Sequence, residues 1–237
     1  MNAGSGNIVL DNTGVGVIHT DIGAVSLTSS GTITISDNIT TDGENINFVG
    51  DVVLNSSGQT ITISSGTGGG NIDFSERIDA TASGSNAEGL TILSGTGTTV
   101  VDKGIGTQTA LGDLTIGASQ AGAITLSGSV GADAAAGAAV MLIGNSDTST
   151  LTLSGADYNS GSSAQTYTAD AFVINGTDPT FTSSNAAIKF VDGASSDIIL
   201  SDTANLTIRT SGGLIDIEPE IIGTADGANT TVTMNAG

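Results

Sequence analysis

Residues 46–74 read INFVGDVVLNSSGQTITISSGTGGGNIDF, and this stretch decides the fold class. It contains four short runs with apolar residues at both ends, namely Ile46–Phe48, Val52–Leu54, Ile61–Ile63 and Ile72–Phe74. Apolar residues at every second position place their side chains on one face of an extended strand. The segments between the runs are rich in Gly, Ser, Asn and Thr, which favour turns. The stretch therefore predicts very short β-strands joined by tight turns.

The same pattern recurs along the whole chain. Apolar runs or single apolar positions stand at Ile8–Leu10, Val25–Leu27, Ile33–Ile35, Leu90–Ile92, Leu114–Ile116, Ile124–Leu126, Met141–Ile143, Leu151–Leu153, Val173, Ile188–Phe190, Ile199, Leu206–Ile208, Leu214–Ile217 and Val232–Met234. No segment has the amphipathic pattern of a helix, and the Ala-rich stretch 131–139 is interrupted by Gly137. We therefore predict an all-β chain.

The shortness of the strands favours one all-β architecture. Aromatic residues are 3% of the chain, too few for the core of a β-sandwich about 10 Å thick. A parallel β-helix needs less, because its coils stack about 4.8 Å apart around a narrow aliphatic interior. The chain has 2 prolines, which suits coils whose N–H groups must bond to the next coil. With about 20 residues per coil, we expect a β-solenoid of roughly a dozen coils, about 55 Å long.

Composition excludes several functional classes. The 237 residues contain 4 Lys and Arg against 24 Asp and Glu, a formal net charge of −20. Such a chain cannot neutralise the phosphates of a nucleic acid, and it is repelled by an anionic membrane surface. No apolar run is long enough to span a bilayer. The chain has 0 Cys, which excludes disulfides, thiolate catalysis and cysteine-ligated metals.

Several phrases resemble the repeats of filamentous-haemagglutinin-type proteins. They are Ile39–Phe48 (ITTDGENINF), Gly68–Phe74 (GGGNIDF), Leu111–Ile116 (LGDLTI) and Ser163–Thr168 (SAQTYT). The resemblance covers most of the chain and implies a right-handed parallel β-helix within a giant exported bacterial adhesin. It further implies a cell-surface or secreted location and a role in attachment to neighbouring cells or surface glycans. We expect residues 1–237 to be a single structural shaft segment of such a protein.

The ends of the chain repeat one another. Met1–Gly4 reads MNAG, and so does Met234–Gly237. We therefore expect a segment cut from a longer repetitive protein, with flanking repeats of the same chain as its neighbours and with the export signal elsewhere. Cut solenoid ends expose unpaired strand edges, so we also expect end-to-end self-association.

A polysaccharide-active β-helix, a lyase or hydrolase, is the alternative function. Such enzymes need carboxylates that converge on a groove. Glu218 and Glu220 flank Pro219, and their spacing would place them on one strand face. However, Tyr158 and Tyr167 are the only polar rings available as sugar platforms. We therefore predict no enzymatic activity and no catalytic residue.

Metal and cofactor sites have little support in the sequence. His19 is the only histidine, so a zinc site lacks partners. The Gly-rich runs 66–70 and 95–97 lack the following Lys-Ser/Thr of a phosphate-binding loop. Asp192, Asp197 and Asp202 are weak calcium candidates, because aspartates in flexible turns supply hard oxygen ligands. We expect incidental calcium binding at most and no required cofactor.

An ice-binding solenoid is a further alternative. Thr32–Thr34, Thr60–Thr62 and Thr150–Thr152 each place two threonines on one strand face. Ice binding would need such pairs on neighbouring coils, whereas these are 28 and 90 residues apart. Threonine also suits any exposed strand face, and that is the interpretation we favour.

Overall fold

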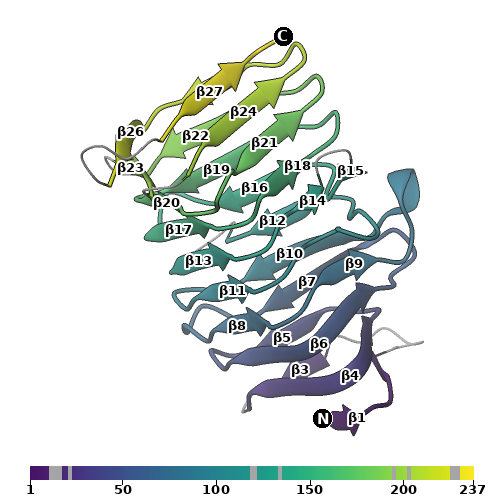
Figure 1. The fold of residues 1–237 in the computed structure, drawn as a ribbon. Coiled ribbons are helices and arrows are strands. Elements are labelled where there is room, and N and C mark those ends of the chain that lie inside the picture. Colours follow the sequence, from purple (N-terminus) through teal and green to yellow (C-terminus); the bar gives the residue numbers. More distant parts are fainter. Residues whose placement is uncertain are drawn as a thin grey trace.

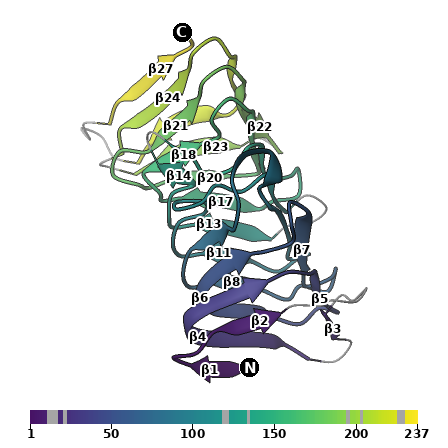
Figure 2. The same ribbon diagram turned by 90° about the vertical axis from the view of Figure 1, so that its right-hand side faces the viewer.

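The chain forms a parallel β-solenoid of about 8 turns with almost no helix (Figures 1 and 2). The computed structural model describes residues 1–10, 18–20, 23–117, 122–132, 135–193, 196–201, 204–224 and 230–237. Successive turns stack along one axis, with the two termini at opposite ends of the stack. The described residues include no helix long and apolar enough to cross a membrane.

Strands from successive turns stack in register to build the faces of the solenoid. The first face consists mainly of β1 (Asn2–Gly4), β4 (Val25–Ile35), β6 (Ile46–Leu54), β8 (Ile72–Phe74), β11 (Thr99–Val101), β13 (Ala123–Leu126), β17 (Thr150–Leu153), β20 (Phe172–Ile174), β23 (Asp197–Leu200) and β26 (Glu220–Gly223). The second face consists of β3 (Ile18–Thr20), β5 (Ile39–Thr41), β7 (Thr60–Ser64), β10 (Gly89–Leu93), β12 (Leu114–Ile116), β16 (Met141–Gly144), β19 (Gln165–Ala169), β22 (Ile188–Asp192) and β25 (Ile215–Ile217).

A third face closes the cross-section. Near the N-terminus it is built by β2 (Ile8–Leu10), by the second halves of the long strands β4 and β6, and by β9 (Ile78–Ala80). Isolated parallel pairs carry it from Ile78 through Ile105 and Val130 to Tyr158. It then continues as the sheet of β18 (Asp157–Asn159), β21 (Thr180–Ser183), β24 (Leu206–Thr210) and β27 (Val232–Asn235). Ile105 and Val130 lie in segments without a clear strand pattern, and these pairs show that both residues belong to the stack.

Two small elements lie outside the parallel sheets. The short hairpin of β14 (Gly131–Ala132) and β15 (Ala135–Ala136) is antiparallel. Residues Gly84–Asn86 form a single turn of 3-10 helix, η1.

The expected number of coils was wrong because each turn is longer than assumed. Ile46 pairs with Ile72, which lies 26 residues further along, and Ile61 pairs with Leu90, 29 residues further along. The estimate allowed about 20 residues per coil. Gly- and Ser-rich corner segments take up the additional residues. At about 4.8 Å per turn, about 8 turns give a stack about 40 Å long instead of 55 Å.

Alternating burial confirms the period-2 pattern of the sequence. In β6, Ile46, Phe48, Val52 and Leu54 are fully buried and Gly50 is buried with them, whereas the residues at alternate positions lie nearer the surface. Phe48 stacks on Phe74 of the next turn, with ring centroids 4.5 Å apart. One continuous apolar core runs from Ile8 to Ile208. Stacking the turns therefore buries what a single turn leaves exposed.

The C-terminal half of the core contains several aromatic residues, whereas the sequence led us to expect small aliphatic ones. Tyr158 stacks on Phe181 at 4.6 Å, and Tyr167 stacks on Phe190 at 4.9 Å. Gln165 is buried among these rings and accepts a 2.9 Å hydrogen bond from the Tyr167 hydroxyl. Burial raises the pKa of both Tyr158 and Tyr167. These tyrosines are core residues and offer no surface platform for a sugar.

The two Met-Asn-Ala-Gly segments occupy different positions in the stack. Asn2–Gly4 forms β1 and pairs with Thr28 and Ser29 of β4 on the first face. Met234 and Asn235 lie in β27 and pair with Ile208 and Arg209 of β24 on the third face. Identical sequence therefore has different neighbours at the two ends.

Candidate functional site

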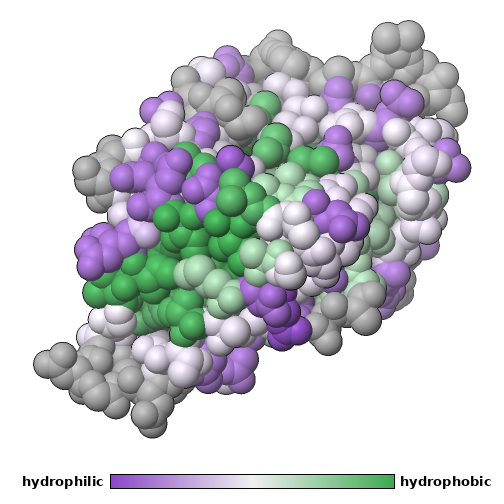
Figure 3. All heavy atoms as spheres, turned by 90° about the horizontal axis from the view of Figure 1, so that it is seen from above, coloured by the Kyte–Doolittle hydropathy of each residue, from purple (hydrophilic) through white to green (hydrophobic). Residues whose placement is uncertain are grey.

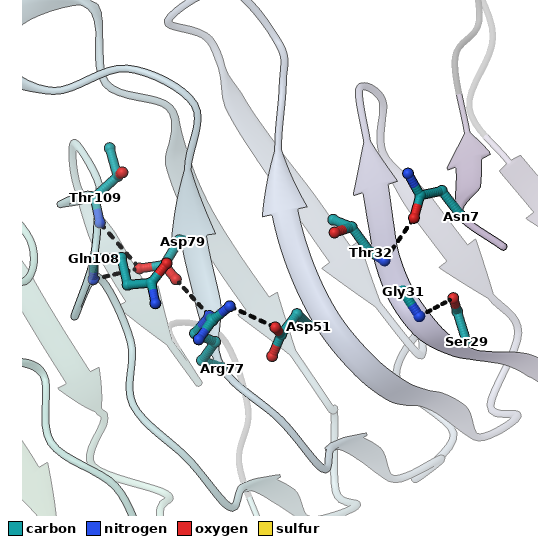
Figure 4. Close-up of polar contacts among 9 residues, drawn as sticks. All are labelled: Asn7, Ser29, Gly31, Thr32, Asp51, Arg77, Asp79, Gln108 and Thr109. Carbon is teal, nitrogen blue, oxygen red and sulfur yellow. Dashed lines mark hydrogen bonds and ion pairs between the residues drawn. The ribbon is translucent and has the colours of Figure 1, made fainter. Parts of the chain in front are cut away.

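A groove lies at the corner where the first face turns into the third, near the N-terminal end of the stack. Its volume is about 400 Å³, within the range of small-ligand sites. It is lined by Thr28, Ser29, Ser30, Gly31, Val49, Gly50, Asp51 and Glu76. These residues come from β4, from β6 and from the short connection between β8 and β9. The groove therefore crosses three successive turns of the solenoid. Figure 4 shows polar contacts in this region.

Glycines at the corner shape the floor of the groove. Gly50 has φ +140°, a backbone conformation that L-residues rarely adopt, and a Cβ there would collide with the carbonyl oxygen of Ser29. A Cβ on Gly31 would collide with Oδ1 of Asn7, which accepts a 3.0 Å hydrogen bond from the backbone N–H of Thr32. The two long strands can therefore bend side by side only because neither carries a side chain at these positions.

Serine hydroxyls fix the first wall of the groove. The Ser29 hydroxyl donates a hydrogen bond of 2.5 Å to the carbonyl of Gly6. It also accepts one of 2.9 Å from the N–H of Gly31, which Figure 4 shows. The Ser30 hydroxyl donates to the carbonyl of Gly4 at 3.0 Å. Each hydroxyl thus ties the corner to the first residues of the chain.

Arg77 holds two carboxylates beside the groove. Its Nη2 lies 2.6 Å from Oδ2 of Asp51, and its Nε lies 3.2 Å from Oδ2 of Asp79 (Figure 4). The Asp79 side chain, 7% exposed, also accepts backbone hydrogen bonds from Gln108 at 2.9 Å and Thr109 at 3.2 Å. One guanidinium therefore holds two carboxylates from neighbouring turns in fixed positions.

The groove can accept hydrogen bonds more readily than it can donate them. Asp51 and the exposed Glu76 supply carboxylate oxygens, and Val49, 44% exposed, supplies a small apolar surface. Carboxylates only accept hydrogen bonds, whereas hydroxyls both donate and accept. This arrangement suits a neutral ligand rich in hydroxyl groups, and it repels anions.

Two other carboxyl groups have shifted pKa values. Burial and the neighbouring Asp102 raise the pKa of Asp73 on the outer side of β8. Burial alone would also raise the pKa of Glu88, but hydrogen bonds from the Thr81 hydroxyl and from backbone N–H groups outweigh it and lower that pKa. The Thr81 hydroxyl bond is 2.7 Å long, and the Thr81 and Ala82 N–H bonds are 3.1 and 3.3 Å. Glu88 thereby fixes the loop that contains η1.

The structure places two of the three calcium candidates. Asp192 accepts hydrogen bonds through Oδ1 from the N–H and the hydroxyl of Ser196, at 2.7 and 2.9 Å. Asp197 begins β23 and pairs with Glu220 of β26. Asp202 lies outside the described residues. Within the described ranges, no group of three His, Asp or Glu side chains is arranged to hold a metal ion. Calcium binding at these residues stays a prediction.

The proposed alternation of Glu218 and Glu220 on one strand is wrong. Glu218 follows β25 and Glu220 begins β26, so the corner at Pro219 separates them. Glu218 accepts a 3.1 Å hydrogen bond from the N–H of Asp192. The pair therefore does not share one strand face as an acid and a base.

The threonine pairs lie on three different faces. Thr32–Thr34 belongs to the part of β4 on the third face, Thr60–Thr62 to β7 on the second, and Thr150–Thr152 to β17 on the first. They therefore form no common array. The Gly-rich runs 66–70 and 95–97 are turns, as predicted. The side chain of His19, in β3, lies outside the described part of the chain.

Sequence reasoning did not find the groove, Arg77 or Glu88. Asp51 and Arg77 are 26 residues apart, so only knowledge of the turn length would have brought them together. Glu88 stands in a segment without strand pattern, and no local signal marked it as buried.

Comparison with protein-family models, curated proteins and solved structures found no match to this chain.

Proposed function

We propose that this chain is a rigid shaft segment of an exported bacterial surface protein of the filamentous-haemagglutinin type. In this role the stacked turns hold adhesive regions away from the cell. The family assignment rests on the sequence phrases quoted above, and the repetitive β-solenoid fold is compatible with it.

One observation carries the shaft proposal: the apolar core is continuous along the stack, from Ile8 to Ile208. Each turn contacts mainly the turns before and after it, so further turns extend the rod without changing its cross-section. Inter-turn hydrogen bonds run along all three faces. A rod of this kind resists bending, which is the mechanical property that a spacer needs.

The location is tested in the source bacterium. An antibody raised against this chain is used for an immunoblot and for labelling of intact cells. A band far above 23.1 kDa together with surface labelling supports the proposal. A band near 23.1 kDa that is protected inside intact cells contradicts it.

We further propose that neutral glycans bind in the groove between the first and third faces. The hydroxyl of Ser30 and the carboxylates of Asp51 and Glu76 support this proposal, because sugar hydroxyls hydrogen-bond to both kinds of group. Several weak contacts of this kind gain strength when many copies are displayed on one surface.

The glycan proposal is tested on a glycan array with Glu76→Gln and a matched control. We expect Glu76→Gln to weaken retention because the amide is uncharged and only one of its polar ends accepts hydrogen bonds. Glu44→Gln changes an exposed glutamate outside the groove and should leave retention unchanged. If the unmodified chain retains no glycan, the groove proposal fails and the shaft proposal remains.

A further inference from the structure

The sequence contains five asparagines that stand two residues before a serine or threonine, with no proline between them. They are Asn38, Asn55, Asn175, Asn205 and Asn229, and the last lies outside the described residues. This spacing is the acceptor motif for N-linked glycosylation, in which a sugar is joined to the asparagine amide nitrogen. The motif is short and arises often by chance, so the place of each asparagine in the solenoid decides which of them can accept a sugar.

Asn55 and Asn175 both have the exposed side chain that this reaction needs. Each is the first residue after a strand, β6 in one case and β20 in the other. Their backbone N–H groups donate to the carbonyls of Ile35 and Leu153 in the preceding turn, at 2.8 and 3.2 Å, which fixes the main chain. Both residues are exposed, and neither side-chain amide has a hydrogen-bond partner among the described residues.

The hydroxyl residues of these two motifs, Ser57 and Thr177, are exposed as well. Ser57 has φ +57° and is the only non-glycine residue with a positive φ in the described ranges, so the chain turns sharply within its motif. Thr177 lies in the connection between β20 and β21. Seen from above in Figure 3, hydrophilic residues lie at many places around the outline of the molecule. An enzyme can therefore reach the amide and the hydroxyl of each motif from outside the rod.

Asn38 and Asn205 carry the same motif, but their side chains are part of the stack. Oδ1 of Asn38 accepts a 2.7 Å hydrogen bond from the N–H of Thr62 in the next turn. The amide nitrogen of Asn205 donates to Asp178 at 2.8 Å, and its Oδ1 accepts from the N–H and the hydroxyl of Thr231 at 3.2 and 2.9 Å. Both residues are half-buried, so transfer of a sugar to either amide would disrupt contacts between turns.

We propose that Asn55 and Asn175 are N-glycosylation sites. The substrate is a sugar activated at C1 by a phosphate or pyrophosphate group on a nucleotide or lipid carrier. When the amide nitrogen attacks C1, a C1–N bond forms and the C1–O bond to the carrier breaks. The electron pair of the broken bond leaves on the phosphate oxygen, and one amide proton passes to a base of the transferase. This inference goes beyond the shaft proposal, because it concerns accessible side chains whatever the shaft carries.

Peptide mass spectrometry of the protein isolated from its source bacterium tests the proposal. Cleavage after Lys, Arg and Glu places the four described motifs in different peptides, which end at Glu44, Glu76, Lys189 and Arg209. We expect sugar on the peptides of Asn55 and Asn175 at least about 10-fold more often than on the other two, where contacts between turns must break first. Sugar-free peptides, or equal occupancy of all four, would overturn the proposal.

Substitutions of the hydroxyl residue separate recognition of the motif from simple exposure. When expressed in the source bacterium, Thr177→Ala should lose the modification of Asn175, because the motif requires a hydroxyl at this position. Thr177→Ser is the matched control, since it retains the hydroxyl and should retain the modification. Circular dichroism checks that the two variants fold alike. Modification of Asn175 that persists in Thr177→Ala would contradict the assignment.

Transfer in vitro identifies the carrier of the sugar. The chain is produced in a host without the transferase and is then incubated with UDP-linked hexoses and the soluble fraction of the source cells, or with their membranes alone. Transfer in the first mixture identifies a nucleotide carrier, and transfer by the membranes identifies a lipid carrier. Either result at Asn55 and Asn175 supports the proposal. Failure in both mixtures, together with sugar-free peptides from the source cells, overturns it.

Discussion

Replacing Gln165 with Leu should remove between about 2 and 4 kcal/mol from the free energy of unfolding. The Gln165 amide nitrogen lies 3.0 Å from the carbonyl of Tyr158, 3.1 Å from the hydroxyl of Ser160 and 2.6 Å from the carbonyl of Thr182. Its amide oxygen accepts a 2.9 Å hydrogen bond from the Tyr167 hydroxyl. Each lost hydrogen bond costs about 0.5–1.5 kcal/mol, and a buried hydroxyl left without its partner about 1–3 kcal/mol.

The group most affected by this change is the Tyr167 hydroxyl. The carbonyl of Thr182 still accepts the N–H of Ser160 at 3.2 Å, whereas the Tyr167 hydroxyl keeps only a 3.7 Å contact with the sulfur of Met141. Adding Tyr167→Phe to the Leu variant removes this hydroxyl, and we expect the double variant to regain at least about 1 kcal/mol.

Urea unfolding followed by circular dichroism measures these differences through the transition midpoint. The control Thr166→Val changes the outward neighbour of Gln165 and should alter stability by less than about 0.5 kcal/mol. If the double variant is no more stable than Gln165→Leu alone, the orphaned hydroxyl is not the cause of the loss, and the reasoning about the buried network is refuted.

Three further predictions concern charge and backbone. The pKa of Glu88 is lowered, so this carboxylate stabilises the fold above its ordinary pKa of 4.5, and the stabilisation is lost as the pH falls through the folded-state pKa. In urea titrations at a series of acidic pH values, Glu88→Gln should lose less stability with falling pH than the unmodified chain. Burial raises the pKa of Tyr158 and Tyr167, so unfolding should become easier above pH 10.0, less steeply in Tyr167→Phe. Gly50→Ala should cost about 1–3 kcal/mol in thermal unfolding, whereas Gly23→Ala, with open space at its Cβ, should be close to neutral.

The sequence was sufficient for the strands and their inward residues where apolar and polar positions alternate. Ile46–Phe48 and Ile72–Phe74 have polar centres, and both form strands with buried ends. The sequence pattern does not fix the orientation of Val173 and Ile199, which lie outward between buried neighbours. In both segments all three positions are apolar, so alternation does not distinguish the two faces of the strand.

The aromatic core could not be found from the pattern for a related reason. Tyr158 stands between Asp157 and Asn159, so no apolar alternation marks it as inward. Its burial follows from its register with Val130 and Phe181 in the neighbouring turns. Register depends on the number of residues in each corner, and these numbers vary along the chain. The groove escaped prediction in the same way, because its walls come from three turns.

The outward residues of the first face indicate where function should be sought. The fold constrains inward positions strongly, because each must fit between two neighbours in the core. The outward column has no such constraint, and its character changes along the stack. Near the N-terminus it contains Ser26, Asn47 and Asp73 in β4, β6 and β8. At the other end it contains Val173, Ile199 and Ile222 in β20, β23 and β26.

Solubility alone would favour polar residues along the whole of this column. The apolar side chains at its C-terminal end include that of Ile222 in β26, which is 38% exposed. The polar N-terminal part of the same face adjoins the groove that contains Asp51 and Glu76. One face thus presents polar side chains beside the groove and apolar side chains at β20, β23 and β26, so a search for binding partners should treat these two surfaces separately.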